Sequence, residues 1–204
     1  MDPTFRKATA EDSDLVADLV FGETGGEGIR VAAAVLGFED SERLRPLFRQ
    51  VWRAAENWRQ SEVLIVEGEP AGVLQTGSSS MKITPGVVLA AVRALGLRAL
   101  RMPGRLGIMD RVSPKKPDGA FIISEIHVDE EYRGRGLGAT MMERAEEQAR
   151  AGGYTVMALH TRTSNPARRL YDRCGFKEAG EATDPEFERL TGVRGNVLYV
   201  KRLD

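Results

Sequence analysis

The sequence predicts an α/β fold, of the α+β layered kind, with a mixed central sheet of about six to seven strands flanked by helices. Short apolar runs typical of strands alternate with longer segments whose apolar residues recur at helical spacing. Two of the runs, residues 63–66 and 71–77, flank the sequence EGEP and are typical of a β-hairpin. We expect residues 1–204 to form one domain.

Local patterns predict the elements around this hairpin. Residues 5–9 alternate like a short strand, and Thr9 with Asp12 resembles a capping box that opens a helix through about Phe21. Residues 41–60 carry apolar side chains at helical spacing, which predicts one amphipathic helix. The other expected elements are helices at residues 136–151 and 166–173 and strands at residues 121–128, 154–159 and 196–203.

The region between the third and fourth expected strands, residues 78–118, is predicted to hold a helical insertion. Within residues 85–103, one helical stripe is apolar and Pro103-Gly104 is expected to end the helix. The stripe consists of Val88, Val92, Leu95, Ala99 and Met102. From Lys82 to Lys116 the sequence has eight basic residues and one acidic residue. The basic side chains could contact an acidic partner or a membrane surface, or could surround a packed apolar stripe, and the second interpretation is favoured.

Composition excludes several function classes. With 29 basic and 30 acidic residues, the chain lacks the charge of a nucleic-acid-binding protein. A single cysteine, Cys174, excludes an internal disulfide, and two histidines leave no ligand set for a structural zinc, so no metal is expected. Residues 1–10 lack the apolar core of a signal peptide, and arginines interrupt the most apolar stretch. We therefore expect a cytoplasmic protein without a membrane partner.

A glycine-rich loop follows the strand expected at residues 121–128. The segment from Gly134 to Ala139 fits the dinucleotide-binding pattern G-x-G-x-x-G/A, so a nucleotide-dependent oxidoreductase is one candidate. However, five residues separate Val128 from the first glycine, and no acidic residue for a ribose follows about 20 residues later. No P-loop sequence occurs in the chain. The loop could still hold a phosphate through backbone amides and through Arg133 and Arg135, or could simply begin a helix.

Two segments together resemble the GCN5-related N-acetyltransferase (GNAT) superfamily. EIHVDEEYRGRGLGATMMERA contains its [RQ]-x-x-G-x-[GA] signature as Arg133-x-x-Gly136-x-Gly138, and LHTRTSNPARRLYDRCGF resembles the segment after its fifth strand. The close match covers roughly residues 120–178. The resemblance implies an acetyl-CoA cosubstrate whose pantetheine arm lies between two splayed strands. The cofactor-binding residues that it implies are Ile126, His127, Val128, Arg133, Gly134, Arg135, Gly136, Leu137, Gly138, Ala139, Asn165 and Tyr171.

The resemblance also implies catalytic residues for acyl transfer to an amine. Tyr171 matches the tyrosine that faces the sulfur and can donate a proton to the leaving thiolate. Glu125 and His160 are candidate bases, and His127 lies on the same strand face as Glu125 unless a β-bulge changes the alternation. The spacing from Asn165 to Tyr171 is one residue shorter than usual, and Asn165 is expected to cap the next helix as well as to contact the coenzyme. Cys174 is expected to pack rather than to carry an acyl group.

The acceptor is not defined by the sequence. Glu23 and Glu27, in the segment GETGGEG, would suit a cationic amine, whereas the basic region 82–116 would suit an acidic one. The function expected is transfer of an acetyl group to a primary amine of a small molecule or a protein N-terminus. A non-catalytic CoA-binding module or sensor is the alternative, and a homodimer is possible.

Overall fold

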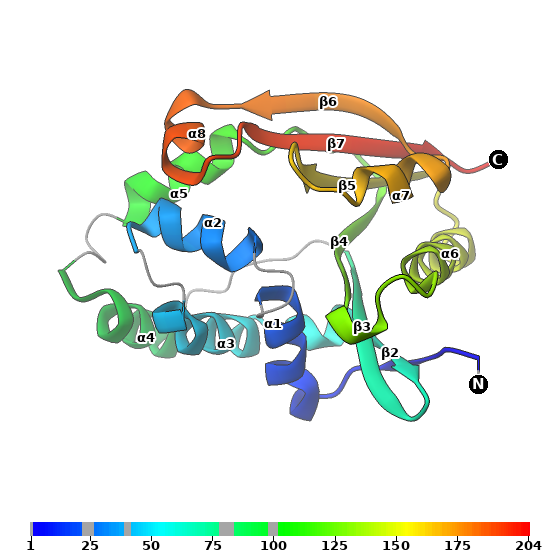
Figure 1. The fold of residues 1–204 in the computed structure, drawn as a ribbon, viewed down its shortest axis with the longest axis horizontal. Coiled ribbons are helices and arrows are strands. Elements are labelled where there is room, and N and C mark those ends of the chain that lie inside the picture. The colour runs from blue at the N-terminus through cyan, green and yellow to red at the C-terminus, as the bar shows by residue number, and fades with distance from the viewer. Residues whose placement is uncertain (1, 22–26, 39–41, 78–83, 98–101) are drawn as a thin grey trace.

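The computed structural model describes residues 2–21, 27–38, 42–77, 84–97 and 102–204. Strands and helices alternate along this chain around one sheet (Figure 1). The strands are β1 (Thr4–Lys7), β2 (Ser61–Val66), β3 (Glu69–Thr76), β4 (Phe121–Val128), β5 (Val156–Arg162), β6 (Lys177–Thr183) and β7 (Gly195–Arg202). The α-helices are α1 (Ser13–Phe21), α2 (Glu27–Leu36), α3 (Arg45–Ala54), α4 (Pro85–Leu95), α5 (Met102–Arg111), α6 (Leu137–Ala151), α7 (Arg168–Arg173) and α8 (Pro185–Thr191).

The seven strands form one mixed sheet in the order β1-β2-β3-β4-β5-β7-β6. Only β4 and β5 pair in parallel, and the other neighbouring strands are antiparallel. These seven strands therefore do not form the doubly wound parallel sheet that an oxidoreductase of the dinucleotide-binding kind requires. The predicted α/β class, with a mixed sheet of about six to seven strands and a helical insertion between β3 and β4, is confirmed, and the sheet has seven strands.

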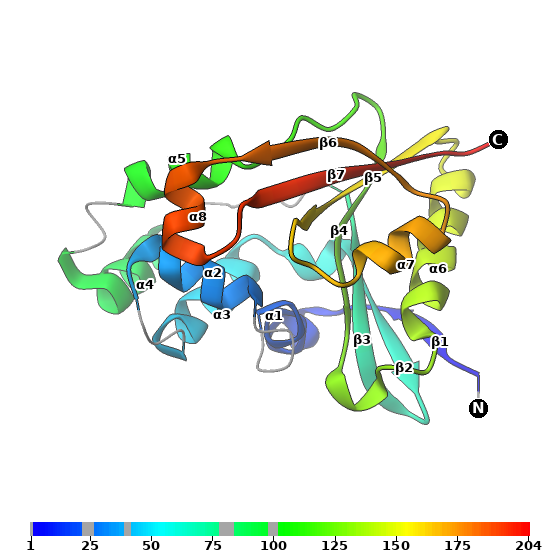
Figure 2. The ribbon, with the colours of Figure 1, turned by 45° about the horizontal axis from the view of Figure 1, so that its top comes forward.

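Helices cover both faces of the sheet. On one face, α6 buries Met141, Met142, Ala145 and Ala149 against β2 to β5 and β7, as the helical pattern predicts. On the other face, Val16 and Val20 of α1 pack with Val63 and Val73 of the hairpin. Figure 2 shows α6 and α1 on opposite sides of the strands β2, β3 and β4. The cleft described below opens between these two helical layers.

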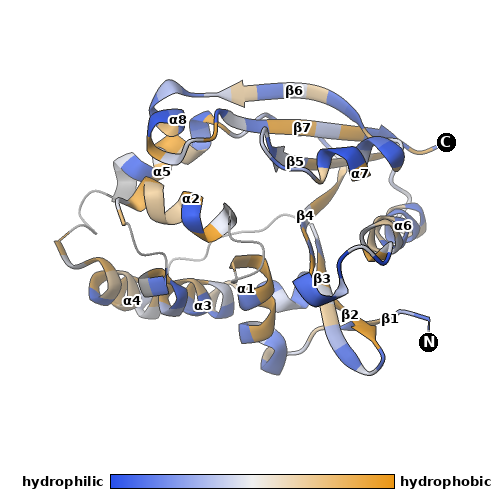
Figure 3. Cartoon of the chain, viewed as in Figure 1, coloured by the Kyte–Doolittle hydropathy of each residue, from blue (hydrophilic) through white to orange (hydrophobic). Residues whose placement is uncertain are grey.

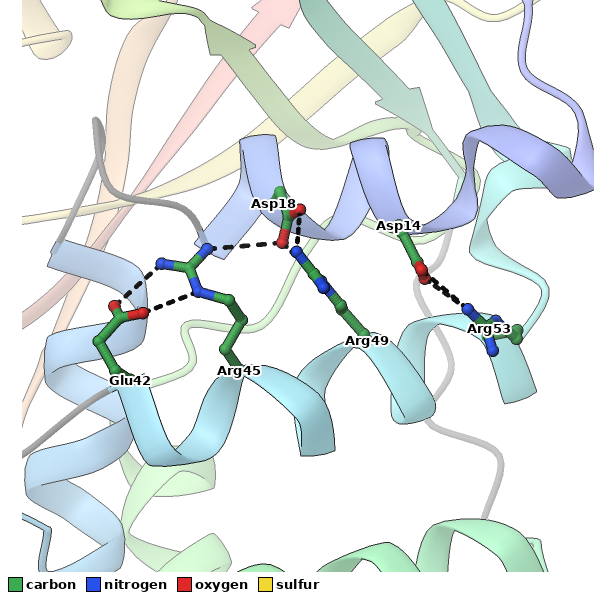
Figure 4. Close-up of polar contacts among 6 residues, drawn as sticks. All are labelled: Asp14, Asp18, Glu42, Arg45, Arg49 and Arg53. Atoms are coloured by element: carbon green, nitrogen blue, oxygen red, sulfur yellow. Dashed lines mark hydrogen bonds and ion pairs between the residues drawn. The ribbon is translucent and has the colours of Figure 1, made fainter.

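Ion pairs fix α1 against α3. Arg49 binds the Asp18 carboxylate with two hydrogen bonds of 2.9 and 2.5 Å, and Arg53 binds Asp14 at 2.8 Å (Figure 4). Arg45 bridges Glu42 at 2.9 Å to the same Asp18 at 3.5 Å. Exposed ion pairs contribute little individually, but bidentate pairs in a network restrict geometry. The C-terminal end of α1, which reaches the cleft, is therefore held in a defined position.

The hairpin and the N-terminal cap agree with the sequence prediction. Glu67 and Gly68 both have positive φ, 56° and 91°, as a tight β-turn between twisted strands requires. The Asp12 carboxylate accepts hydrogen bonds from the Thr9 amide at 2.7 Å and from the Thr9 hydroxyl at 3.0 Å. Arg6 of β1 donates two further bonds of 2.7 Å to Asp12, which hold the pKa of that carboxyl well below its usual range.

Two predicted helices are wrong in extent. The helix expected at residues 41–60 ends at Ala54, because Glu56 takes a left-handed backbone conformation (φ 52°), and a separate turn of 3₁₀ helix follows at Asn57–Gln60. The helix expected at residues 85–103 ends at Leu95 before Gly96, and Pro103 and Gly104 lie in the first turn of α5 instead of ending a helix. Proline suits a first turn because its missing N–H is not needed there.

Further differences concern elements and strand limits. The helices α2, α5 and α8 and the strand β6 were not predicted. β5 begins two residues later than expected and continues to Arg162, so His160 lies within the strand, and α7 begins at Arg168 rather than at Pro166. β4 is mostly half-buried. No helix within the described parts of the chain is long and apolar enough to cross a bilayer.

Candidate active site at the splayed strands

The cleft begins where β4 and β5 separate. Their parallel pairing comprises Phe121 with Met157, Ile122 with Ala158 and Ile123 with Leu159. β4 then continues to Val128 paired with β3 but not with β5. A bulge marks the same position on the other side of β4, because Gln75 pairs with Glu125 but Thr76 pairs with Ile123. The extra residue, Ser124, donates its hydroxyl hydrogen bond to the Gly77 carbonyl.

The bulge decides which way Glu125 points. Ile123 packs in the core beneath α6, and in an unbroken strand Glu125, two residues later, would face the same side. Instead Ile126 packs beneath α6, while His127 is opposite Val73, which packs against α1. Glu125 and His127 therefore face the α1 side of the sheet.

The strand separation forms a cleft of about 850 Å³ that contacts both helical layers. Toward α6 and α7, its walls include Arg133, Gly138, Asn165, Leu170 and Tyr171. Toward α1, α2 and α5, the lining consists of Val20, Phe21, Gly28, Arg30, Ala32 and Met109. Glu125, Ile126, His127 and Val128 of β4 and His160 of β5 also line it. Two molecules that enter from opposite faces of the sheet can thus meet between β4 and β5.

The start of α6 borders the cleft at Gly138. Gly134 and Gly136 have φ of 78° and 82°, a conformation that favours glycine, and Gly136 is the residue immediately before α6. A side chain at Gly138 would meet Leu170 of α7 at 2.9 Å, so glycine allows α6 and α7 to approach. The first amides of a helix have no partner within it and favour an anion. The turn therefore fits a phosphate group.

The two arginines of this turn differ in position. Arg133 lines the cleft, and its Nε donates to the Val128 carbonyl at 3.2 Å. The Arg135 guanidinium lies 5.2 Å from the ring centre of Tyr132 and donates to the Glu131 carbonyl at 3.4 Å. Of the implied cofactor residues, the structure brings Ile126, His127, Val128, Arg133, Gly138, Asn165 and Tyr171 to the cleft. Leu137 instead fills the core with its side chain, and Gly134, Arg135, Gly136 and Ala139 do not line the cleft.

Tyr171 ends a chain of hydrogen bonds inside the cleft. Asn165 donates to the Thr161 hydroxyl at 2.8 Å and accepts from the Ala167 amide at 2.9 Å, so it begins the helical turn before α7 as expected. Burial raises the pKa of the Tyr171 phenol to about 12, although a hydrogen bond with Thr161 lowers it by a smaller amount. A phenol oxygen can accept a hydrogen bond while its own hydrogen is donated elsewhere, so the Tyr171 hydroxyl can act as a donor in the cleft.

Glu125 and His127 form a hydrogen-bonded pair. His127 Nε2 lies 2.9 Å from Glu125 Oε2, and each side chain is 28% exposed. Since a carboxylate can only accept, Nε2 carries the hydrogen of this bond, and in that tautomer the ring's lone pair is on Nδ1. The pair therefore offers one basic nitrogen supported by a negative charge.

His160 lies on β5 in a different environment. Burial and the nearby positive charge of Lys116 lower the pKa of His160 to about 4, although the Pro114 backbone opposes this shift. Its Nε2 is buried and accepts or donates no hydrogen bond within the described chain. Burial also lowers the pKa of Lys116, which interacts electrostatically with Glu125. His160 is thus a neutral imidazole near pH 7.

Several site residues were not found from the sequence. Thr161 and Lys116 gave no signal beyond being polar residues near expected strand ends, and the whole α2 and α5 lining was absent from the prediction. Cys174 packs against the core beneath α6 as expected, and burial raises the pKa of its thiol. Two glutamates were considered for binding the acceptor. Glu23 lies outside the described residues. Glu27 is the first residue of α2, and its side chain lies outside what the structure describes.

Comparison with known proteins agrees with this geometry. The profile of the Acetyltransferase (GNAT) family matches residues 41–176. The fold resembles an N-acetyltransferase from Staphylococcus aureus Mu50 (TM-score 0.62, 15% identity, covering 97% of this chain and 99% of that one). It also resembles the PaiA N-acetyltransferase of Thermoplasma acidophilum in complex with coenzyme A (TM-score 0.57, 12% identity, covering 100% of both chains). No curated protein matches this sequence significantly. The family profile spans most of the chain, including β4, the glycine turn and Tyr171, and the chain therefore belongs to the GNAT family of acetyltransferases.

Proposed function

We propose that the protein transfers an acetyl group from acetyl-CoA to a primary amine by direct attack within a ternary complex. The observation that carries the proposal is the cleft between β4 and β5, which contacts both faces of the sheet. The cleft is lined by Arg133 and Gly138 beside the start of α6 and by the hydrogen-bonded pair of Glu125 and His127. Direct transfer requires both reactants to be held together, and such positioning is a large part of catalysis.

The residues present fit acetyl-CoA. Arg133 and the first amides of α6 would hold the pyrophosphate, because they combine a permanent cation with unpaired N–H groups. The backbone of β4 beyond Ile123 has lost its β5 partner and would pair with the amide-containing pantetheine arm as an added strand does. Bound in this way, acetyl-CoA supplies the thioester that is attacked.

Glu125 and His127 are proposed to accept the proton of the incoming ammonium. Attack requires a neutral amine, whereas amines are protonated near pH 7. Nδ1 of His127 would take the proton while the Glu125 carboxylate, 2.9 Å from Nε2, stabilises the imidazolium. His160 is less suited, because transfer from an ammonium to a base with a pKa of about 4 is uphill by roughly 8 kcal/mol.

Tyr171 is proposed to assist the leaving sulfur. A phenol with its pKa raised to about 12 remains protonated and can donate a hydrogen bond as charge develops on the sulfur. Complete proton transfer to a thiolate, whose conjugate acid has a pKa of about 8.5, would cost roughly 5 kcal/mol. The main contribution of Tyr171 is therefore to stabilise the negative charge on the sulfur. The thiolate becomes protonated as the attacking nitrogen loses its second proton.

The acceptor would enter from the side of α1, α2 and α5. That wall combines apolar side chains such as Phe21 and Met109 with the guanidinium of Arg30. A further structure with the same fold is described as a Drosophila melanogaster polyamine N-acetyltransferase that forms N-acetylagmatine (TM-score 0.54, 17% identity, covering 99% of this chain and 100% of that one). Polyamines therefore belong in an acceptor screen with amino acids, aminoglycosides and peptides with free N-termini.

Two measurements test the proposal. First, acetyl-CoA should raise the melting temperature and NAD should not. Second, release of free thiol should be followed over the amine panel, with the wild type compared with Tyr171→Phe. The acetyltransferase proposal is supported if the wild type acetylates at least one amine and Tyr171→Phe acetylates it more slowly.

The outcomes separate the candidate functions. Stabilisation by acetyl-CoA without turnover of any amine would favour a non-catalytic CoA-binding sensor. Stabilisation by NAD alone would overturn coenzyme A binding.

A further inference from the structure

The helix α4 exposes an apolar ridge. Among the described residues, the exposed large apolar side chains are Val88 (49%), Leu89 (49%), Val92 (51%), Leu97 (86%) and Tyr154 (41%). Four of these five fall within ten residues of sequence. Val88 and Leu89 lie one helical turn before Val92, so the three share one face of α4.

The neighbouring face of α4 is already used for packing. Val87, Ala91 and Leu95 are buried, and the last two belong to a cluster with Leu44 and Leu47 next to α3. The predicted core stripe of Val88, Val92 and Leu95 is therefore wrong at its first two members, while Ala99 and the Met102 side chain lie outside what the structure describes. Figure 3 shows α4 mainly in the orange of apolar residues, and Figures 1 and 2 place it at the end of the molecule away from α6. Helix packing thus leaves the ridge of Val88, Leu89 and Val92 facing outward.

Positive charge surrounds this ridge in the sequence. No acidic residue occurs from Met81 to Met109, whereas this stretch contains Lys82, Arg93, Arg98, Arg101 and Arg105. The chain as a whole has a formal net charge of −1, so the excess is local. Arg93 is exposed on α4 and forms no ion pair with any residue that the structure describes. Among the described residues, this surface therefore combines the apolar ridge with the positive charge of Arg93.

We propose that this surface, the α4 ridge with Arg93, attaches the protein reversibly to the face of an anionic phospholipid bilayer. Apolar side chains can enter the boundary between headgroups and acyl chains while nearby arginines bind lipid phosphates. α4 has 11 residues and is about 16 Å long, about half the hydrocarbon thickness, so it lies along the surface and does not span it. The proposal departs from the expectation of no membrane partner.

A second copy of the chain fits this surface less well. In a symmetric dimer through α4, the two copies of the ridge would bring Arg93 close to its own counterpart. Like charges at an interface oppose association. An anionic bilayer provides the opposite charge over a wide area and requires no groove.

Vesicle sedimentation tests the proposal without coenzyme or acceptor, so its result is independent of the proposed enzymatic function. The full chain is mixed with vesicles of phosphatidylcholine alone or with about a third phosphatidylglycerol. We expect at least about tenfold more binding to the anionic vesicles, and loss of that binding at about 0.5 M salt. The double variant Leu89→Ser/Val92→Ser should bind about tenfold less, and Arg93→Gln about fivefold less.

Matched controls separate the surface from general effects. Arg202→Gln removes an exposed arginine of β7, and Tyr154→Ser removes an exposed large side chain between α6 and β5. Both should bind like the wild type, and all variants should keep the wild-type oligomeric state and melt cooperatively. The proposal is overturned if anionic vesicles bind no protein at low salt or if the controls lose binding equally. It is also overturned if the α4 variants instead dissociate a dimer.

Discussion

The two strands that border the cleft place their ionisable groups in different environments. On β4, Glu125 and His127 are each 28% exposed and share a hydrogen bond of 2.9 Å. On the β5 side, burial lowers the pKa of His160 to about 4 and raises the pKa of Tyr171 to about 12. Burial disfavours charge, so both groups are neutral near pH 7.

This difference indicates a division of work. The β4 side combines a carboxylate with an imidazole at the edge of water, where a proton can be taken up and released. The β5 side offers neutral hydrogen-bonding groups that can stabilise charge on a substrate without carrying charge themselves. The bulge at Ser124 is essential to this arrangement, because it turns Glu125 away from the core and into the cleft.

The largest effect is expected for Glu125→Gln. The amide keeps the size of the side chain and can still accept a hydrogen bond from His127, but it cannot balance an imidazolium charge. We expect kcat/KM for an amine from the acceptor panel to fall about 10²-fold at pH 7. Steady-state thiol release measures this value.

The control for Glu125→Gln is coenzyme binding. The rise in melting temperature with acetyl-CoA should stay at the wild-type value, since the carboxylate faces the acceptor side. A rate within about threefold of wild type would place the base away from β4.

Tyr171→Phe should reduce kcat by about 30-fold with little change in KM for acetyl-CoA. The phenol donates a hydrogen bond mainly as the sulfur becomes charged, so its loss affects the rate more than binding. Initial rates over a range of acetyl-CoA concentrations separate kcat from KM.

Tyr199→Phe is the matched control for this variant. The two rings lie 5.6 Å apart, but the Tyr199 hydroxyl binds Glu178 at 3.0 Å and Arg168 at 3.2 Å. It should therefore keep the wild-type kcat. Equal losses in the two variants would show that packing, not the Tyr171 hydroxyl, sets the rate.

Arg133→Ala should weaken acetyl-CoA binding about tenfold, as expected for loss of one charge-assisted contact to a phosphate. Arg135→Ala is the control on the same turn, because that guanidinium lies over Tyr132 and not in the cleft. Calorimetric titration with coenzyme A compares the two. A larger loss with Arg135→Ala would mean that the turn rearranges on binding.

The sequence predicted the cofactor side of the cleft better than the acceptor side. Residues 120–178 follow strand, turn and helix signals that are local, and Arg133, Gly138, Asn165 and Tyr171 all reach the cleft. The bulge at Ser124 is not local, because it depends on the register between β3 and β4. Strand periodicity therefore cannot predict which face of the sheet Glu125 occupies.

The helix predictions at residues 41–60 and 85–103 were wrong for a different reason. In α4, apolar residues lie on both the packed and the exposed face, so periodicity alone cannot select the core stripe. In the segment expected as a helix at residues 41–60, apolar spacing continues past Ala54 although Glu56 interrupts the backbone. Glutamate at positive φ has no sequence signature, since this conformation is uncommon outside glycine and asparagine.

The smallest catalytic effect is expected for His160→Gln. A histidine that is neutral throughout the physiological range contributes no proton uptake, so kcat/KM should change less than about threefold at pH 7. A loss as large as that of Glu125→Gln would assign proton acceptance to β5 and end the division of work between the two strands.

The same variant tests the environment of His160 through stability. Its folded pKa of about 4 is below the ordinary value of 6.5, so below pH 6.5 the unfolded chain binds a proton that the folded chain resists. The stabilisation is complete above pH 6.5 and is lost as the pH falls toward 4. We therefore expect the melting temperature of wild type to fall more steeply than that of His160→Gln between pH 6.5 and pH 4.

Carboxylates paired with arginine, such as Asp12, lose their stabilisation equally in both proteins, so the difference between the two curves isolates His160. Parallel curves would show that the imidazole is solvated, and His160 would then again be a candidate for the base.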